Sequence, residues 1–250
     1  MMINQMYFHY VDDKSVSSFI ETHSDQFQGK LKTYYNYSRV VCLADFSNVL
    51  EHHGLANVAK VAVVSGSSSD PEIQLLKYEN LHIIDYDAST NSYDLDSDWS
   101  LGTDLKVARG GYDFVLCSQV LEHIYSPLQG LRNLSHITRP GAYIWLSIPT
   151  VNCIHGEPYF YSAGYHPRYL SRLGKEAGLE CVYIGMWGNR KYLVSAVLGR
   201  WLTHDQLRPG FHSKFDLAFP YLALQDGRSN DLSGHFITDC WALYRRPESD

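Results

Sequence analysis

Short apolar runs alternate with helical patterns along most of the chain. The runs are rich in β-branched and aromatic residues and are bounded by glycine, proline and polar residues, which is typical of β-strands. They cover residues 60–65, 81–85, 112–117, 142–149, 180–187 and 236–246. Strands that alternate with helices over short turns form a mostly parallel sheet with helices on both faces. The pattern therefore predicts an α/β fold.

Between these runs, apolar residues recur at intervals of three and four, which indicates helices. The clearest helical patterns cover residues 15–28, 38–53, 120–137 and 166–178. A further helix is expected to begin near Asp70, because serine, aspartate, proline and glutamate are grouped there as they are at helix N-termini. We expect a helical cap at residues 1–57 and a sheet domain at residues 58–250. An irregular insertion at about residues 188–235 is a candidate lid over the substrate.

Composition excludes several classes of protein. A net charge of −6 without a long basic run is not typical of proteins that bind nucleic acid. The longest apolar run, residues 192–202, is too short to span a bilayer, and the N-terminus does not resemble a signal peptide. We expect a cytoplasmic protein without a nucleic-acid or membrane partner. The five cysteines are scattered and form no C-x-x-C pair, and no H-E-x-x-H pattern occurs, so we expect neither a disulfide framework nor a metal site.

Polar residues follow four of the predicted strands. They form the segments SGSSSD (65–70), DYD (85–87), CSQ (117–119) and PTVNCIH (149–155). In open α/β sheets the carboxyl ends of the strands border the ligand crevice. An acid at the end of the second strand, here Asp85 with Asp87 as the alternate, can accept the hydroxyls of a ribose. The serine segment taken alone is also explained by a tight turn with a helix cap, so the ligand hypothesis depends on the combination.

Four segments together resemble class I S-adenosylmethionine-dependent methyltransferases. They are VAVVSGSSSD (61–70), HIIDYD (82–87), residues 112–149 and HPRYLSRLGKEAGLE (166–180). The third segment contains the D-x-V-x-x-x-x-V-L-E-H signature of small-molecule methyltransferases. The resemblance covers about residues 58–187 and the closing strand. It implies a Rossmann-like, doubly wound sheet of seven mostly parallel strands with an antiparallel last strand. It also implies S-adenosylmethionine as the cofactor.

The resemblance assigns the first two polar segments to the cofactor. Ser65, Gly66 and Ser67 stand in place of the family's G-x-G core and would lie against the methionine moiety. Asp85 would hold the ribose hydroxyls. Tyr86 would cover the adenine.

Later segments would complete the cofactor site. Asp98 and Trp99 stand where the family has an acid for the adenine amino group followed by an apolar residue, although Asp96 competes with Asp98 for this role. Three residues at the end of the third strand would border the sulfonium and the transferred methyl group, namely Cys117, Ser118 and Gln119.

Two histidines, His123 and His155, are candidates for a general base, because imidazole titrates near neutral pH. His123 is also compatible with a structural role as a half-buried histidine that hydrogen bonds a neighbouring loop. Glu122, beside it, is compatible with a stabilising acid in the first turn of a helix. His155 lies where related methyltransferases often have a histidine followed by a proline and an acid, but this chain has Phe160 in place of the acid.

Methyl transfer from a sulfonium requires alignment of the acceptor, exclusion of water and, for a hydroxyl acceptor, removal of a proton. The aromatic segment 158–169 and the irregular segment 203–235 are candidates for the acceptor pocket and its lid. We expect an enzyme that methylates a hydroxyl of a small polar acceptor such as a sugar or natural product, with an amine as the nearest rival. The alternative is an inactive, methyltransferase-like binding or structural domain. A hydrolase with Ser67 or Ser68 as nucleophile is disfavoured because no G-x-S-x-G motif is present.

Overall fold

The computed structural model describes residues 8–86, 93–101, 109–198, 201–207 and 236–248. Its strands form a seven-stranded sheet in the order β1-β6-β7-β5-β4-β2-β3. β7 is antiparallel to its neighbours β5 and β6, and the other neighbouring strands are parallel. The strands are β1 (Phe8–Tyr10), β2 (Asn57–Val64), β3 (Lys77–Ile84), β4 (Tyr112–Ser118), β5 (Thr138–Pro149), β6 (Glu180–Trp187) and β7 (Asp239–Arg245). This sheet confirms the predicted Rossmann-like fold and its antiparallel last strand.

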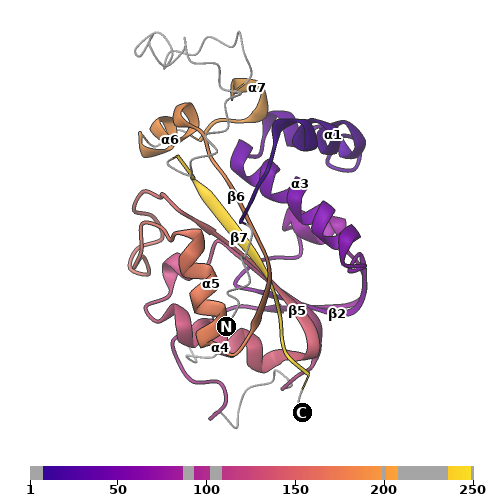
Figure 1. The fold of residues 1–250 in the computed structure, drawn as a ribbon, viewed down its shortest axis with the longest axis vertical. Coiled ribbons are helices and arrows are strands. Elements are labelled where there is room, and N and C mark those ends of the chain that lie inside the picture. The colour runs from indigo at the N-terminus through magenta and orange to yellow at the C-terminus, as the bar shows by residue number, and fades with distance from the viewer. Residues whose placement is uncertain (1–7, 87–92, 102–108, 199–200, 208–235, 249–250) are drawn as a thin grey trace, which may run out of the picture.

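Helices cover both faces of the sheet (Figure 1). The α-helices are α1 (Asp13–His23), α2 (Lys30–Thr33), α3 (Tyr37–His52), α4 (Pro127–Ile137), α5 (Pro167–Glu176), α6 (Arg190–Val197) and α7 (His204–Leu207). Two short 3-10 helices are η1 (Pro71–Leu75) and η2 (Leu121–His123). α1 and α3 lie on one face, and α4 and α5 on the other.

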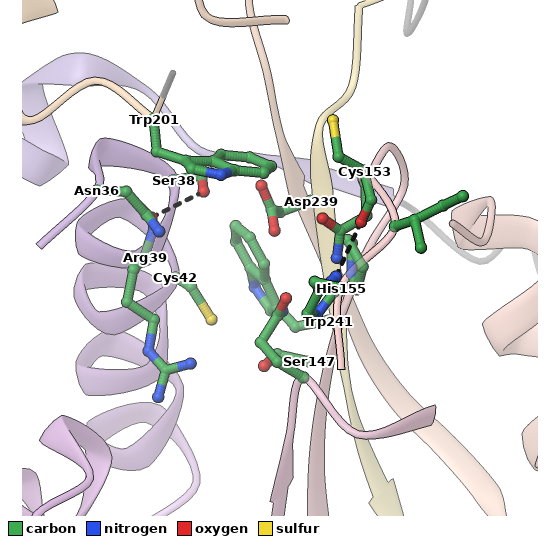
Figure 2. A pocket seen from close by; sticks show the side chains of 14 residues that line it. Asn36, Ser38, Arg39, Cys42, Ser147, Cys153, His155, Trp201, Asp239 and Trp241 are labelled. Carbon is green, nitrogen blue, oxygen red and sulfur yellow. Dashed lines mark hydrogen bonds between the residues drawn. The ribbon is translucent and has the colours of Figure 1, made fainter. Parts of the chain in front are cut away.

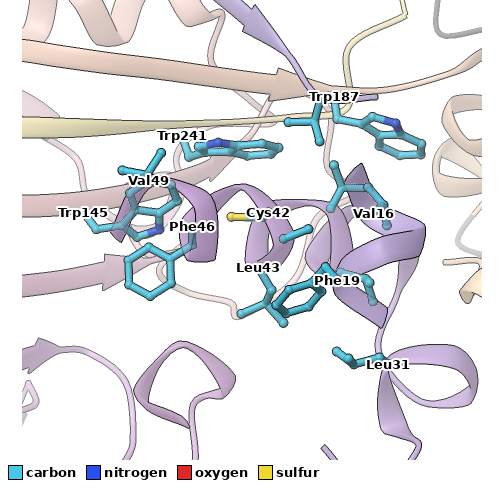
Figure 3. Packing of buried hydrophobic residues seen from close by; sticks show 14 of the residues in the cluster. Val16, Phe19, Leu31, Cys42, Leu43, Phe46, Val49, Trp145, Trp187 and Trp241 are labelled. Atoms are coloured by element: carbon cyan, nitrogen blue, oxygen red, sulfur yellow. The ribbon is translucent and has the colours of Figure 1, made fainter. Parts of the chain in front are cut away.

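The alternation of side chains along the strands divides the core into two clusters. Val61 and Val63 of β2 pack toward α1 and α3, whereas Ala62 and Val64 pack toward α4 and α5. On the α3 face, the centres of the Phe46 and Trp145 rings lie 4.7 Å apart (Figure 3). Because a strand buried on both faces has no polar side, these strands appear in the sequence as continuous apolar runs.

The N-terminal segment also takes part in the sheet. β1 pairs in parallel with β6, with Phe8 opposite Ile184, and forms the edge of the sheet. α3 buries eleven of its sixteen residues. The segment expected to be a helical cap therefore contributes a strand as well as helices, and the domain boundary at residue 57 stays a prediction. Most of the expected lid, residues 208–235, lies outside the described residues, as does Asp87.

Two predicted helices differ from the structure. The helix expected near Asp70 is the short η1, and the continuous helix expected over residues 120–137 is divided into η2 and α4. α4 begins at Pro127 because proline lacks an amide hydrogen and disfavours helical geometry in the residue before it, here Ser126. Within the described residues, no helix has the length and apolar character that crossing a membrane requires.

Candidate functional site

Two cavities, each of about 450 Å³, lie beyond the carboxyl ends of the parallel strands. We call one the tyrosine cavity, because its lining includes Tyr86, Tyr93, Tyr159 and Tyr161. The other is the tryptophan cavity, whose lining includes Trp201 and Trp241. Gln119 lines both cavities. The two cavities therefore meet at the residue that follows β4.

The backbone turns sharply where the cavities meet. Gln119 has a φ of 58°, in the left-handed region that residues with a side chain seldom adopt. Its N–H donates to the carbonyl oxygen of Ser147 on β5 over 2.8 Å. Ser65, which follows β2 and lines the tyrosine cavity, has a φ of 52°. Strained backbone of this kind occurs preferentially at functional sites.

The tyrosine cavity contains part of the predicted cofactor site. Ser65, Tyr86 and Gln119 line it, and the Tyr86 ring meets that of Tyr159 edge to face. Asp96, the alternative to Asp98, also lines this cavity. Its carboxylate accepts the N–H of Ser126 at 2.6 Å and that of Tyr125 at 3.1 Å, which ties it to the start of α4.

Asp98 does not reach the cavity. Its side chain is fully exposed and accepts hydrogen bonds from the N–H and hydroxyl of Ser100, which hold the pKa of the carboxyl below its ordinary value. Trp99 is buried in the core, where its indole N–H donates to the carbonyl oxygen of Asp94 at 2.7 Å. Of the two candidate acids, Asp96 lines the tyrosine cavity and Asp98 does not, while Trp99 packs in the core.

Asp85 and the glycine loop are arranged differently from the expectation. Asp85 is exposed, accepts the N–H of Tyr86 at 2.9 Å, and is not part of the cavity lining. Ser67 is exposed, and its hydroxyl donates to Asp70 at 3.0 Å. A Cβ on Gly66 would clash with the Asp70 carboxylate and lie 2.7 Å from Val63, so only glycine fits this turn.

The end of β4 is divided between core and crevice. Cys117 is fully buried in the core, and burial raises the pKa of its thiol. The Ser118 hydroxyl donates to Glu72 on η1 over 3.2 Å. Only Gln119 of the three predicted residues reaches the cavities.

The tryptophan cavity carries polar atoms that have no partner among the described residues. These are Nε of Arg39, Oγ of Ser147 and Oδ2 of Asp239, each buried. Figure 2 shows Arg39 on α3 at one side, Ser147 and Asp239 on the strands opposite, and Trp201 across the top. Buried polar atoms without partners are unfavourable and rare, so their concentration here indicates a polar ligand.

Asp239 reaches this position because β7 is antiparallel. Its first residue, rather than its last, lies at the carboxyl edge of the parallel strands, opposite Pro149 of β5. Desolvation raises the pKa of Asp239 to about 6, although the Ser38 and Thr238 hydroxyls and the Arg39 charge lower it in part. A carboxyl group that titrates near neutral pH can accept a proton from a substrate.

The two predicted histidines are brought together at the junction of the cavities. The rings of His123 and His155 meet edge to face with their centres 4.7 Å apart. His123 lines the tyrosine cavity and His155 the tryptophan cavity. A Cβ on Gly156, whose φ is 66°, would lie 2.9 Å from Cε1 of His123, so a glycine is needed for the loop to approach. Glu122 is buried beside them, and desolvation raises its pKa to about 7.

Sequence reasoning missed Arg39, Ser147 and Asp239. A signal existed for Arg39, because the helical pattern around it is apolar on nearly every side, as in buried helices. An arginine in such a helix requires a partner, which here is Glu72, with Nη2 and Oε2 2.6 Å apart. No comparable pattern marks Ser147 and Asp239, since both lie within apolar strand runs.

The fold and crevice define an open α/β sheet that binds a ligand at the carboxyl ends of its strands. Residues 46–184 match the family model described as a methyltransferase domain. Because this match spans more than half of the chain, the chain belongs to the methyltransferase domain family. The resemblance noted from the sequence is thereby confirmed, although the match does not test the signature at residues 120–123 itself. No curated protein matches the chain significantly.

Several solved structures are similar to the chain. The cyclase SpnF aligns with a TM-score of 0.51 and 10% identity, over 98% of this chain and 99% of that one. CalH, a trans-methyltransferase in complex with S-adenosylhomocysteine, aligns with a TM-score of 0.49 and 10% identity, over 93% and 65% of the two chains. Phosphoethanolamine N-methyltransferase 2 of Haemonchus contortus aligns with a TM-score of 0.45 and 10% identity, over 82% and 52%. At these identities the similarity shows the fold alone.

Proposed function

We propose that the chain transfers a methyl group from S-adenosylmethionine, held in the tyrosine cavity, to a hydroxyl group of a small polar acceptor held in the tryptophan cavity. The observation that carries this proposal is the meeting of two similar-sized cavities at Gln119. In a methyltransferase, donor and acceptor must lie in line on either side of the transferred group. Two cavities with one shared residue provide that arrangement.

The tyrosine cavity suits the donor in shape and chemistry. Aromatic faces attract a cation, and the rings of Tyr86 and Tyr159 both line this cavity. Asp96 and Asp94 add acidic groups near the adenosyl position. Asp85 lies one residue from Tyr86 at the end of β3, and its proposed contact with the ribose hydroxyls stays a prediction.

The tryptophan cavity suits an acceptor that both donates and accepts hydrogen bonds. Arg39 supplies a donor, Asp239 an acceptor and Ser147 either. The indole rings of Trp201 and Trp241 supply flat apolar walls. This mixture fits a sugar or another polyhydroxylated molecule, and an amine is the second candidate for the methylated group.

Asp239 is the best-placed proton acceptor. S-adenosylmethionine supplies a methyl group on a positively charged sulfur that leaves as a neutral thioether. As the acceptor oxygen forms its bond to the methyl carbon, the hydroxyl proton passes to Oδ2 of Asp239, which has no other partner among the described residues. Gln119 fixes the position of the junction through its hydrogen bond to Ser147.

Calorimetric titration with S-adenosylmethionine and S-adenosylhomocysteine tests the donor part of the proposal. We expect both to bind, and Tyr159→Ala to weaken both, while Tyr34→Ala, at an exposed tyrosine outside the cavities, leaves affinity unchanged. Absence of heat with either ligand would favour the inactive binding or structural domain. Release of S-adenosylhomocysteine in a panel of hydroxyl and amine acceptors then distinguishes O-methylation from N-methylation.

A further inference from the structure

We propose that Glu122, His123 and His155 form a binding site for one divalent transition-metal ion, with zinc as the best match. One nitrogen of each imidazole and one carboxylate oxygen of Glu122 all lie within 4.8 Å of one another. Two imidazoles and a carboxylate are a donor set of catalytic zinc sites. Such sites keep a further coordination position open for water or substrate.

The hydrogen bonds of both histidines favour the metal-binding tautomer. Nδ1 of His123 lies 2.5 Å from the carbonyl oxygen of Tyr159, and Nδ1 of His155 lies 2.9 Å from that of Cys153. A carbonyl oxygen can only accept, so each Nδ1 carries a hydrogen, and in the neutral imidazole Nε2 is then the nitrogen with a lone pair for a metal. Metal-binding histidines are usually oriented in this way by a backbone carbonyl or a carboxylate.

Glu122 supplies a second, independent indication of a cation. The residue is 1% exposed, and its Oε2 has no hydrogen-bond partner among the described residues. Asp239, which is also acidic, interacts with it electrostatically. A buried carboxylate that lacks a positive partner among the described residues is unfavourable, and an ion held between Glu122 and the two histidines would compensate it.

The backbone around the site holds two of the three ligands in place. Glu122 and His123 lie on η2, and the carbonyl oxygen of Glu122 accepts the N–H groups of Tyr161 and Ser162 at 2.9 and 3.2 Å. Zinc ligands at about 2.1 Å from the ion lie at most about 4 Å apart. The candidate ligand atoms lie up to 4.8 Å apart, and because His155 is exposed, its side chain and loop can shift toward the other two ligands without disturbing the core.

An ion here would lie at the junction of the two cavities, because His123 lines one and His155 the other. Its open position would face the acceptor and bind an acceptor oxygen, which lowers the pKa of a bound hydroxyl. This role, unlike the site itself, rests on the proposed methyl transfer.

Zinc affinity of the metal-stripped protein, measured by competition with a chromophoric chelator, tests the site directly. We expect one zinc ion per chain, and at least about 10-fold weaker binding for His155→Ala and Glu122→Gln. His52→Ala is the matched control, because His52 lies on the exposed end of α3 beside another histidine, and it should bind as the unmodified chain does. Magnesium alone should not compete, because it prefers oxygen ligands.

Absence of stoichiometric zinc binding, or equal affinity in His155→Ala and the unmodified chain, would overturn the proposal. His155→Ala keeps the test valid if the buried Glu122→Gln variant does not fold, since residue 155 is exposed. Cobalt(II) added in place of zinc should give a visible absorption spectrum that His155→Ala changes and His52→Ala does not. Calorimetry of the metal-free chain with S-adenosylmethionine separates failure of the metal site from failure of the proposed methyl transfer.

Discussion

Gln119 donates its backbone N–H to the carbonyl oxygen of Ser147 over 2.8 Å, and both residues line the tryptophan cavity. The bond extends the pairing of β4 with β5 one residue beyond the end of β4. It holds the backbone of Gln119 in the left-handed region, with a φ of 58°. The same residue also lines the tyrosine cavity, so this hydrogen bond positions the wall between the two.

Gln119→Gly should stabilise the protein by up to about 1 kcal/mol, because glycine adopts a positive φ without the penalty of a side chain. Methyl transfer should fall, since the side chain at the junction is lost. Urea denaturation measures the free energy of unfolding. The control is Gln129→Gly in the first turn of α4, where the residue has helical geometry and its side chain donates to Asn133, and it should destabilise by about 0.5–1 kcal/mol. Equal destabilisation by both substitutions would contradict the strain at residue 119.

Much of the sheet could be predicted from the sequence, because six of its strands contain a short apolar run next to turn residues, although in β3 this run covers only the second half of the strand. β1 was not predicted, since three residues at the edge of a sheet are too short to show a pattern. The break before α4 was marked by Ser126-Pro127, yet the apolar spacing on either side of it suggested one helix. Helical periodicity continues across such a break because both parts pack against the same core.

The sequence predicted that the site lies at the carboxyl ends of the strands, but it did not predict every residue that lines the cavities. Ser65, Tyr86 and Gln119 follow strands directly, so the rule that ligands bind at the carboxyl ends of parallel strands locates them. Asp239 lies at the same edge only because its strand is antiparallel, and Arg39 only because α3 packs over the sheet. The grouping of His155 with Glu122 likewise depends on how the loop after β5 folds back, which no local spacing encodes.

Asp239→Asn should make stability less dependent on pH. The pKa of this buried carboxyl is raised from its ordinary value of 3.8 to about 6, so the folded chain binds more protons than the unfolded chain between these two values. The contribution of Asp239 to stability therefore falls as pH rises from about 4 to about 6, by about 3 kcal/mol. Asparagine does not ionise. The variant's advantage in free energy of unfolding should therefore grow over this window and stay constant above it.

Denaturant unfolding at several pH values measures this difference, with Asp98→Asn as the control because the Asp98 carboxyl is fully exposed and its pKa is lowered rather than raised. Methyl transfer by Asp239→Asn should fall about 100-fold or more if the carboxylate accepts the acceptor's proton. If the difference in free energy of unfolding between Asp239→Asn and the unmodified chain does not change between pH 4 and pH 7, Asp239 is not held in an unfavourable charged state.

Glu72→Gln should destabilise the protein by about 3 kcal/mol, because it leaves the partly buried Arg39 charge without its partner. Glu72 is 1% exposed and accepts hydrogen bonds from Arg39 at 2.6 Å and from Ser118 at 3.2 Å, so it links α3 to the end of β4. Glu176→Gln is the control. It removes the exposed pair with Arg172 and should cost less than about 0.5 kcal/mol. Similar losses from the two substitutions, measured by urea denaturation, would argue against a structural ion pair at Glu72.

Gly156→Ala should impair the site more than backbone strain alone explains. Gly156 has a φ of 66°, and an added Cβ would lie 2.9 Å from Cε1 of His123, so the alanine must displace either the loop or the imidazole. Gly178→Ala is the matched control, because its φ of 76° imposes similar strain while nothing lies within 4 Å of the added Cβ. The control should lose about 1 kcal/mol of stability and keep its affinity for S-adenosylmethionine. Gly156→Ala should lose more stability in thermal denaturation and also bind S-adenosylmethionine more weakly in calorimetry, because His123 lines the tyrosine cavity. If the two variants behave alike in both measurements, the close approach of the loop to His123 does not shape the cavity.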